Sequence, residues 1–378
     1  MKAIAFYLPQ FHPIPQNDEW WGRGFTEWTN VSKARPSFPG HYQPHIPADL
    51  GFYDLRLPET RSAQADLARQ YGVGAFCYYH YWFNGKLLLE KPLEAVLADQ
   101  EPDFPFCVCW ANETWTRRWD GGDSKILIDS DLDRYDPDAH FEYLSKAFFD
   151  ERYIRIDGKP VFLIYRIDQF PDIRSTIAQW RAKAQSMGLP GIYLGAIHSH
   201  MHQLSDAETI ALGFDAVVGF EPHWETLQPQ YKMSSVRYPV RRLLGLFRRR
   251  MFIVHDYAAL VRTAMKRQES FEKHFPCVTP GWDNSARRSY GAMIMQNDDA
   301  ELFESWLRDA ARRVSSYPSD EQFVFINAWN EWAEGCHLEP DLRNGHRFLE
   351  AVRRVFGSTD DPRRKSSQRR GLRVTQPR

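Results

Sequence analysis

Eight short apolar segments, each followed by a stretch of helically spaced apolar residues, constrain the fold of this chain more than any other feature. The spacing of Ile173, Ile177 and Trp180, for example, predicts one apolar side of a helix. Eight strands with a helix after each is the count of a closed parallel barrel. The expected strands are Ala3–Leu8, Gly74–Tyr79, Phe106–Trp110, Val161–Tyr165, Tyr193–Ala196, Ala216–Gly219, Cys277–Gly281 and Phe323–Ala328. The expected helices are Arg61–Tyr71, Leu88–Ala98, Asp138–Asp150, Ile173–Met187, Asp206–Gly213, Tyr257–Arg267, Ala300–Val314 and His346–Val355.

A doubly wound open sheet is the rival architecture for such an alternation. It would place a glycine-rich phosphate loop directly after the first strand, whereas residues 9–13 read Pro-Gln-Phe-His-Pro. We therefore predict an α/β fold, a (β/α)8 TIM-type barrel with long strand-to-helix loops. The longest loops, about 10–60 and 221–276, both follow a strand end, where barrel enzymes carry their active sites.

One barrel accounts for nearly the whole chain. Residues 1–356 form the expected catalytic domain, and residues 357–378 read as a basic, disordered tail without apolar periodicity. A formal net charge of −1 argues against a nucleic-acid partner, which needs a broad basic surface. The five cysteines lack the spacing of a disulfide framework, so we expect buried, reduced thiols. The oligomeric state stays open.

The first residues do not resemble an export signal, because Pro9 ends a short strand-like segment. No run of 18 apolar residues is present that could span a membrane. These two observations predict a cytoplasmic protein. The segment 236–250 mixes Arg clusters with Leu and Phe, and two interpretations of it stay open. It is either a solvated loop helix packed on the barrel or a peripheral contact with the inner membrane surface.

Histidines raise the question of a metal. His198, His200 and His202 would share one face of an extended chain and could then chelate an ion, but a loop is the expected conformation there. The sequence contains neither an H-E-x-x-H pair nor a Cys/His cluster of metal-ligand spacing. We predict no metal and no other cofactor.

The candidate catalytic residues are two acids just beyond the last expected strand. Glu331 and Glu334 lie three residues apart and are flanked by Trp and Asn side chains. Acids so close to an apolar strand are costly unless they are paired or used. Retaining glycosyl transfer needs two carboxyl groups about 5 Å apart, and this spacing can reach that distance in a turn. The alternative is a helix N-terminus with an acidic first turn.

Trp beside Asn, Asp or Glu recurs at several expected strand ends. Barrel cores favour Val, Ile and Leu, whereas a pyranose lies with its C–H face on an indole while carboxylates and amides bind its hydroxyls. The side chains expected to share the pocket of the two acids are Trp110, Asn112, Trp282 and Asp283. The predicted substrate-binding residues are His12, Glu27, Trp28, Tyr79, His80, Trp110, Asn112, Glu113, Trp115, Arg117, Glu221, Trp282, Asp283 and Asn330. Arg117 has a second interpretation, bracing its own loop through Asp120 or Asp123.

Several separated segments resemble one known family. They read AFYLPQFH at 5–12, GFTEW at 24–28, WANE at 110–113, PGWDN at 280–284 and NEWAEG at 330–335. In this order they resemble the WbsX-type proteins, bacterial relatives of the family 99 glycoside hydrolases, which are endo-α-mannosidases. The resemblance covers about residues 1–356. It implies a (β/α)8 barrel, in agreement with the strand count.

The resemblance also implies a metal-free mechanism. Glu331 matches the base that takes the proton of the sugar 2-hydroxyl, which attacks the anomeric carbon to give a 1,2-anhydro sugar. Glu334 matches the general acid, then base, so the anomeric configuration is retained without a carboxylate nucleophile. The hydrolases carry His between the two acids, whereas this chain has Ala333 and lacks that hydrogen-bond donor.

WbsX-type proteins resemble components of surface-polysaccharide assembly, such as lipopolysaccharide O-antigen synthesis. We therefore expect a retaining glycosyl-transferring enzyme whose substrate is an oligosaccharide or a lipid-linked glycan at the inner membrane. Two alternatives stay open. The same glutamates would serve an intracellular endo-glycoside hydrolase of α-mannoside or rhamnoside-type glycans, and a barrel that binds carbohydrate without catalysis would need neither.

Overall fold

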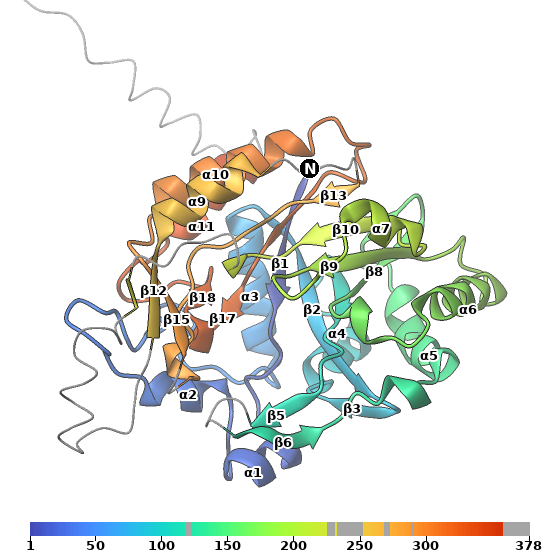
Figure 1. Ribbon diagram of the computed structural model, residues 1–378, viewed down its shortest axis with the longest axis horizontal. Helices are drawn as coiled ribbons and strands as arrows, with labels where there is room; N and C mark the ends of the chain where they lie inside the picture. The colour runs from blue at the N-terminus through green and yellow to red at the C-terminus, as the bar shows by residue number, and fades with distance from the viewer. Residues whose placement is uncertain (118–121, 225–230, 233–251, 268–272, 289–290, 358–378) are drawn as a thin grey trace, which may run out of the picture.

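A ring of parallel strands wrapped by helices forms the centre of the protein (Figure 1). Strand β1 pairs in parallel with β2 on one side and with β16 on the other. The computed structural model describes residues 1–117, 122–224, 231–232, 252–267, 273–288 and 291–357. The ring is made of β1 (Lys2–Tyr7), β2 (Val73–Phe83), β4 (Phe106–Trp110), β8 (Lys159–Ile164), β9 (Tyr193–His198), β10 (Ala216–Gly219), β13 (His274–Phe275), β14 (Cys277–Val278) and β16 (Phe323–Ile326).

The seventh position of the ring holds two short strands separated by Pro276. Strand β13 pairs with β10, and β14 pairs with β16, so one segment of chain contacts both neighbours. Proline has no N–H to donate, which interrupts the ladder between the two pieces. The ring is thus nearly closed, and the predicted TIM-type barrel is confirmed. The expected seventh strand, 277–281, was placed too late in the chain, because the pairing begins at His274.

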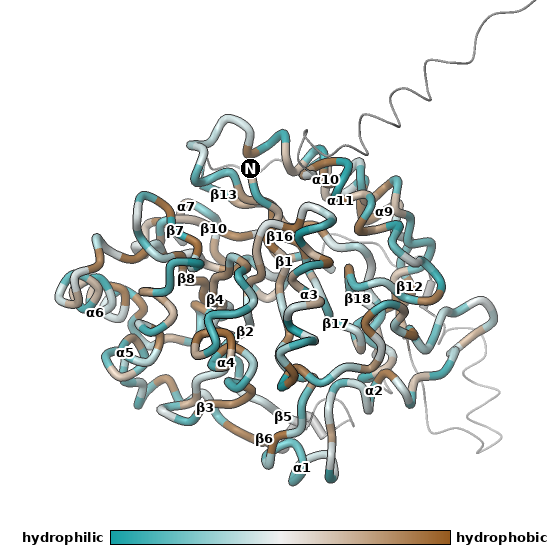
Figure 2. Tube along the Cα trace, turned by 180° about the vertical axis from the view of Figure 1, so that it is seen from behind, coloured by the Kyte–Doolittle hydropathy of each residue, from teal (hydrophilic) through white to brown (hydrophobic). Residues whose placement is uncertain are grey.

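Helices cover the outside of the ring, and their start signals are in the sequence. The side chain of Asp299 accepts the N–H groups of Glu301 and Leu302 and so caps α10, whose apolar side, with Phe303 and Trp306, is buried. Figure 2 shows the outer helix α3 as a largely hydrophilic tube in front of β1 and β2. The covering helices are α3 (Pro58–Gln70), α4 (Lys91–Asp99), α5 (Pro137–Phe148), α6 (Ile173–Ser186), α7 (Asp206–Ala211), α9 (Tyr257–Lys266), α10 (Ala300–Arg313) and α11 (Arg347–Phe356).

The long strand-to-helix loops carry small elements of their own at the C-terminal ends of the barrel strands. The first loop forms two short helices, and the loop after β10 contributes to a second, three-stranded sheet of order β11–β12–β15. These elements extend the barrel on the side where its strands end. They are α1 (Pro15–Trp21), α2 (Glu27–Lys33), β3 (Lys86–Leu88), β5 (Trp115–Arg117), β6 (Gly122–Ile128), β11 (Tyr231–Lys232), β12 (Phe252–Asp256), β15 (Ala292–Gln296), β17 (Asn330–Glu331) and β18 (Cys336–His337). Strand β7 (Arg155–Ile156) lies at the opposite end, where it pairs with the first residues of β8.

Large aromatic side chains fill much of the barrel interior. The Phe6 ring stacks on Tyr79 with 5.6 Å between centroids, and its edge meets Phe220 at 5.4 Å. All five cysteines are buried and unpaired, as expected. Among the described residues no helix has the length and apolar character that crossing a bilayer requires. The basic segment 236–250 and the tail from residue 358 onward lie outside the described residues.

Candidate active site

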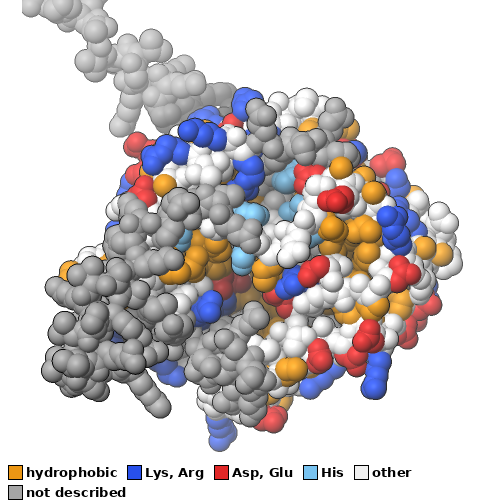
Figure 3. All heavy atoms as spheres, viewed as in Figure 1, with side chains coloured by type: hydrophobic (Ala, Val, Ile, Leu, Met, Phe, Trp, Pro, Cys, Tyr) orange, Lys and Arg blue, Asp and Glu red, His pale blue; other side chains and the backbone are white. Residues whose placement is uncertain are grey.

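A cavity of about 370 Å³ opens at the C-terminal ends of the barrel strands, and both Glu331 and Glu334 line it. Figure 3 shows this face of the molecule, hollowed near its centre, with hydrophobic, histidine and acidic side chains around the depression. The two acids therefore open into one cavity, as the sequence predicted. The predicted residues that line it are Tyr79, Glu113, Trp115, Trp282, Glu331 and Glu334.

A tight turn places the two acids side by side. Residues Asn330–Glu331 pair antiparallel with Cys336–His337, and a 3-10 turn over Trp332–Glu334 connects the two pieces. Gly335 closes the turn at a φ of +56°, where a side chain would be strained. A Cβ at this position would also lie 2.9 Å from the Cβ of Asp283. The turn thus requires glycine, and the expected alternative of a regular helix start is not what forms.

Arg287 is the centre of the site, and its guanidinium binds three carboxylates. Its Nη2 lies 2.8 Å from Glu331 Oε2, and its Nη1 lies 2.7 Å from Glu334 Oε1. Its Nε donates to Glu27 Oε1 at 2.8 Å. A planar guanidinium presents its donors in a fixed fork, so this one residue sets the relative position of both candidate catalytic acids.

Two neighbouring segments hold Arg287 and Glu27 in place. The carboxylate of Asp283 accepts the N–H of Ser285 and starts the short 3-10 helix that precedes Arg287. Glu27 is fully buried in the first turn of α2, where its N–H donates to the carbonyl of Gln10 at 3.0 Å. Glu27 does not line the cavity but lies behind the guanidinium, so its predicted contact with substrate is replaced by a contact with Arg287.

Burial and the repulsion of neighbouring carboxylates raise the pKa of both acids. Burial raises the pKa of Glu331 most; Arg287 lowers it, Glu334 and Glu27 raise it, and the result is about 8. Burial likewise raises the pKa of Glu334, against the lowering effect of Arg287. Burial lowers the pKa of Arg287, yet the three carboxylates outweigh this, so the guanidinium stays charged. Because the pKa of Glu331 is about 8 and that of Glu334 is also raised, the acid pair retains a proton near neutral pH.

The other walls of the cavity are aromatic and polar. Trp115 meets Tyr81 edge-on with 5.1 Å between centroids and also packs against Trp20. Glu113 forms an ion pair with Arg166 at 3.1 Å and is only partly buried. Indole faces beside carboxylates provide the mixed surface that a sugar ring requires.

Three of the four residues expected in the pocket of the acids do not line it: Asp283, which faces a second cavity, and the buried Trp110 and Asn112. Trp110 is fully buried among aromatic rings, and its indole donates to the carbonyl of Trp82 at 3.3 Å. Asn112 is also fully buried, because its amide exchanges hydrogen bonds with the backbone of Arg166. The expected pocket was wrong for all three residues: a strand end can serve packing or a backbone connection as well as a ligand.

Four more predicted binding residues are held by structural contacts behind the cavity. His12 bonds to the carbonyl of Pro9 at 3.0 Å, and the indole of Trp28 donates to a backbone carbonyl. His80 Nε2 lies 2.8 Å from His140 Nε2 in the buried interior. Asn330 uses its amide to bind both the N–H and the carbonyl of Leu8.

The last three predicted residues lie elsewhere. Glu221 is buried and forms an ion pair with Arg267 at 2.7 Å. Asp283 faces a second, smaller cavity and accepts from His41 at 2.6 Å. The backbone of Arg117 belongs to β5, while its side chain lies outside the described residues, so both interpretations of it remain predictions.

Several lining residues were absent from the predicted site. Arg287 lies in a loop, and a single arginine there gives no signal of its role until the fold brings three glutamates around it. Gln10 and Asn284 belong to motifs that the sequence analysis identified, at 5–12 and 280–284. The lining residues not predicted include Gln10, Trp21, Tyr81, Tyr165, His200, Asn284, Arg287, Arg288 and Asn327.

One group of described side chains has the composition of a metal site, namely His45, His337 and Asp341. Hydrogen bonds account for this group without an ion. His337 Nδ1 donates to the carbonyl of Glu339, so its Nε2 can accept from His45 Nδ1 at 2.8 Å. Asp341 accepts the backbone N–H groups of the turn that follows it.

Comparison with known proteins places this site in a family. A family model described as Glycosyltransferase WbsX matches residues 3–352. The chain belongs to this family. Two proteins of Xanthomonas campestris pv. campestris, from strains B100 and ATCC 33913, are each called Uncharacterized protein WxcX and are 42% identical over 359 residues. The match covers 95% of this chain and 50% of each relative, so the chain spans about half the length of these two relatives.

Solved structures share the barrel of this WbsX-family chain. A glycoside hydrolase-like protein has a TM-score of 0.57 at 15% identity, with 94% of each chain covered. A GH99 endo-alpha-mannosidase from Bacteroides thetaiotaomicron has a TM-score of 0.54 at 14% identity, with 97% of this chain and 98% of that chain covered. At these identities the likeness shows the fold, a parallel barrel of the GH99 kind.

Proposed function

We propose that the protein is a retaining, glycosyl-transferring, carbohydrate-active enzyme of cell-surface polysaccharide biosynthesis, of the lipopolysaccharide O-antigen type. One observation carries the proposal: Glu331 and Glu334 face one aromatic-lined cavity and are held by one guanidinium. Membership of the WbsX glycosyltransferase family supports the same class of chemistry. The proposed substrate is an oligosaccharide or a lipid-linked glycan, met in the cytoplasm or at the inner membrane.

The two acids have different roles because their side chains differ in exposure. The side chain of Glu331 is 8% exposed and that of Glu334 is 21% exposed, so Glu334 is more open to the cavity. An acid that protonates the leaving oxygen and later deprotonates the acceptor must reach both groups, which suits Glu334. The more deeply buried Glu331 then takes the proton of the sugar 2-hydroxyl.

The proposed reaction has two steps. In the first, Glu331 takes the 2-hydroxyl proton, the 2-oxygen bonds to the anomeric carbon, and the bond to the leaving oxygen breaks as Glu334 gives that oxygen a proton. In the second, Glu334 takes the proton of the acceptor hydroxyl, the acceptor oxygen bonds to the anomeric carbon, and the 2-oxygen leaves with the proton from Glu331. Two inversions retain the configuration, without a carboxylate nucleophile.

Arg287 keeps the pair ready for this exchange. The pair needs one proton and one negative charge, and a fixed cation beside both carboxylates stabilises the charged member wherever the proton lies. Because Glu27 is buried on the far side of the guanidinium, Arg287 stays in place when a sugar enters.

Mass spectrometry of the host's lipid-linked glycans would test the proposal. We compare cells carrying the wild type, a deletion, Glu334→Gln, and Glu301→Gln as a control that removes an exposed acid on α10. We expect the deletion and Glu334→Gln to truncate the glycan at the same sugar, while Glu301→Gln matches the wild type. Accumulation or lengthening of a glycan of unchanged composition would favour the hydrolase alternative instead. A wild-type glycan with Glu334→Gln would overturn the catalytic role.

A further inference from the structure

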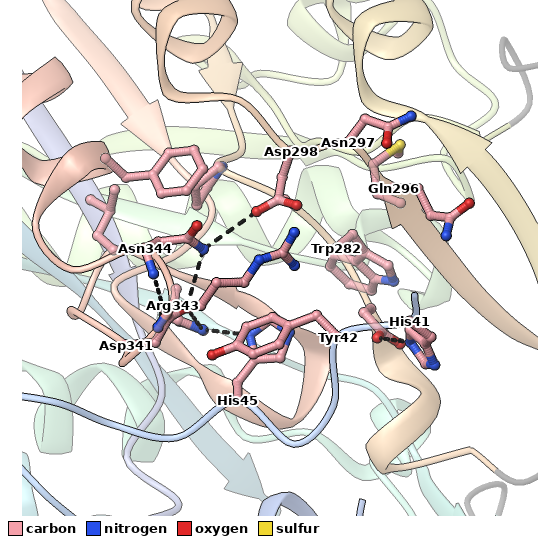
Figure 4. Close-up of a pocket in the computed structure, with 18 of the residues that line it drawn as sticks. His41, Tyr42, His45, Trp282, Gln296, Asn297, Asp298, Asp341, Arg343 and Asn344 are labelled. Carbon is pink, nitrogen blue, oxygen red and sulfur yellow. Dashed lines mark hydrogen bonds and ion pairs between the residues drawn. The ribbon is translucent and has the colours of Figure 1, made fainter. Parts of the chain in front are cut away.

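A second cavity of about 80 Å³ lies on the other side of the catalytic turn (Figure 4). Trp282 lines both cavities, whereas Gly335 lines the second and its neighbour Glu334 lines the first. The wall between them is thin, because the N–H of Asp283 donates to the carbonyl of Glu334 at 2.5 Å. A ligand in the second cavity would therefore lie against the backbone that positions Glu334.

Two of the three aspartates in this cavity are already occupied. Asp283 accepts hydrogen bonds from His41 at 2.6 Å and from Gln43 at 2.8 Å. Asp341 accepts the backbone N–H groups of Arg343 at 2.8 Å and Asn344 at 2.5 Å. These contacts hold the walls of the cavity and leave little capacity for a ligand.

Asp298 and Arg343 are different, because each retains hydrogen-bonding capacity. Asp298 accepts one long hydrogen bond, from the amide of Asn344 at 3.4 Å. The Arg343 guanidinium lies over the ring of Tyr42, 4.7 Å from its centroid. Its charge acts on Asp298, but the described residues include no ion pair between the two side chains. Figure 4 shows the guanidinium reaching between the Asp298 carboxylate and the Tyr42 ring. Burial raises the pKa of Asp298, against the lowering effects of the Arg343 charge and the Asn344 hydrogen bond.

We propose that the second cavity binds one neutral sugar ring, with a hydroxyl bridging Asp298 and Arg343 and a C–H face against Trp282. A hydroxyl both donates and accepts, so it can satisfy a carboxylate and a guanidinium that do not reach each other. The indole of Trp282 provides the apolar surface, and its Nε1 has no hydrogen-bond partner among the described residues. A neutral ligand fits because the charges of the Asp298 carboxylate and the Arg343 guanidinium balance each other.

The size of the cavity limits the ligand to a single ring. A volume of about 80 Å³ admits only part of a hexose, so the rest of the ring projects past the exposed Arg343. The inference takes its ligand class from the proposed function, but it does not depend on the direction of the reaction. It adds a sugar subsite that is separated from the reacting atoms by the Asp283–Glu334 hydrogen bond.

Crystals soaked with methyl α-D-mannopyranoside, and separately with the methyl glycosides of glucose, galactose and rhamnose, would locate the ligand. We expect density for at least one glycoside against Trp282, Asp298 and Arg343. Density in the catalytic cavity alone, or in neither cavity, would overturn the inference.

A titration by ligand-observed NMR measures the same site in solution. Asp298→Asn and Arg343→Ala should each weaken binding of the crystallographically located glycoside about tenfold. Glu301→Gln, which removes an acid from the exposed side of the following helix, should leave the affinity unchanged. Wild-type affinity in both Asp298→Asn and Arg343→Ala would show binding elsewhere and refute the site.

The proposed function and this inference can fail separately. The Glu334→Gln protein lacks the proposed chemistry, yet it should still bind the glycoside in the second cavity. If Glu334→Gln binds the glycoside in the second cavity and the wild type has no activity, only the proposed function is refuted. If the wild type is active and the second cavity stays empty, only the subsite falls.

Discussion

A pair of buried acids and a single buried acid lie within ten residues of each other, and they have different hydrogen-bonding partners. Glu331 and Glu334 face a cavity and share a charged partner, Arg287. Glu339 faces no open space of the catalytic cavity and accepts from neutral donors: the Tyr53 hydroxyl at 2.8 Å, and the Gln64 amide and the Trp332 indole, each at 2.6 Å.

The difference separates acids that can react from acids that hold the fold. The lone pairs of Glu339 are directed at donors that cannot leave, so its carboxylate fixes the turn through Trp332. The carboxylates of Glu331 and Glu334 also point at a cation, but that cation lies at the edge of a cavity with room for a substrate. Similar burial thus produces a reactive pair in one place and a structural anchor in the other.

The largest expected effect is the loss of activity on removing either reactive acid. Glu331→Gln and Glu334→Gln keep the shape of the side chain but cannot exchange a proton, so we expect activity to fall by about 10²- to 10⁴-fold. The measurement is turnover on the glycan that the deletion strain identifies, with circular dichroism to verify folding. Near-wild-type turnover in either variant would show that the substituted acid is not catalytic and would remove the contrast with Glu339.

Arg287→Lys should produce the next largest loss. Lysine keeps the charge but presents it as a point, so it cannot bind both carboxylates in one plane. We expect a decrease of roughly 10- to 100-fold, mainly in kcat rather than KM, because the acids rather than the sugar are displaced. Steady-state kinetics would check this, and a rise in KM alone would show that Arg287 binds substrate instead of positioning the pair.

The pH profile should be bell-shaped, with its alkaline limb near pH 8. Burial and the repulsion of neighbouring carboxylates raise the pKa of Glu331 to about 8 and also raise that of Glu334, so the active form carries one proton between them. Rising pH removes this proton, and falling pH protonates the base. The logarithm of kcat/KM plotted against pH measures both limbs. An alkaline limb that is unchanged in Glu334→Gln would assign it to another group.

Glu339→Gln should leave activity least affected and change the pH dependence of stability instead. Burial raises the pKa of Glu339 from 4.5 to about 7, against hydrogen bonds that lower it. The folded state therefore binds more protons between these values, and the wild type loses roughly 3 kcal/mol of unfolding free energy as pH rises through this window. Glutamine does not titrate, so the Glu339→Gln protein should not lose this unfolding free energy as pH rises. Urea unfolding at pH 4.5 and 8 measures the difference, and parallel curves for the two proteins would contradict it.

Much of the architecture follows from local signals. The expected strand Phe106–Trp110 coincides with β4, because a short apolar run bounded by turn residues has few other uses. The seventh strand was expected to begin at Cys277, but its pairing begins at His274, before Pro276. A proline inside the segment conceals this earlier start in the sequence. The sequence did not predict the three-stranded sheet β11–β12–β15, since its strands are short and come from two loops, one after β10 and one after β14.

The candidate site includes residues that local sequence patterns identified and others that they misplaced. The acid pair could be read from the sequence because both members lie in one turn, and Trp282 because it stands in a marked motif. Trp110 and Asn112 looked the same in sequence, yet one packs in the core and the other binds backbone. Composition at a strand end does not reveal which way a side chain faces.

The sequence by itself determined the barrel, the family and the two acids, because alternating apolar runs and a short charged turn are local properties of the chain. Only the tertiary structure decided that Arg287, 44 residues before Glu331, binds it and Glu27 at once. Contacts across such separations depend on how the strands close into a ring. For the same reason, only the structure showed that Trp282 stands between two cavities.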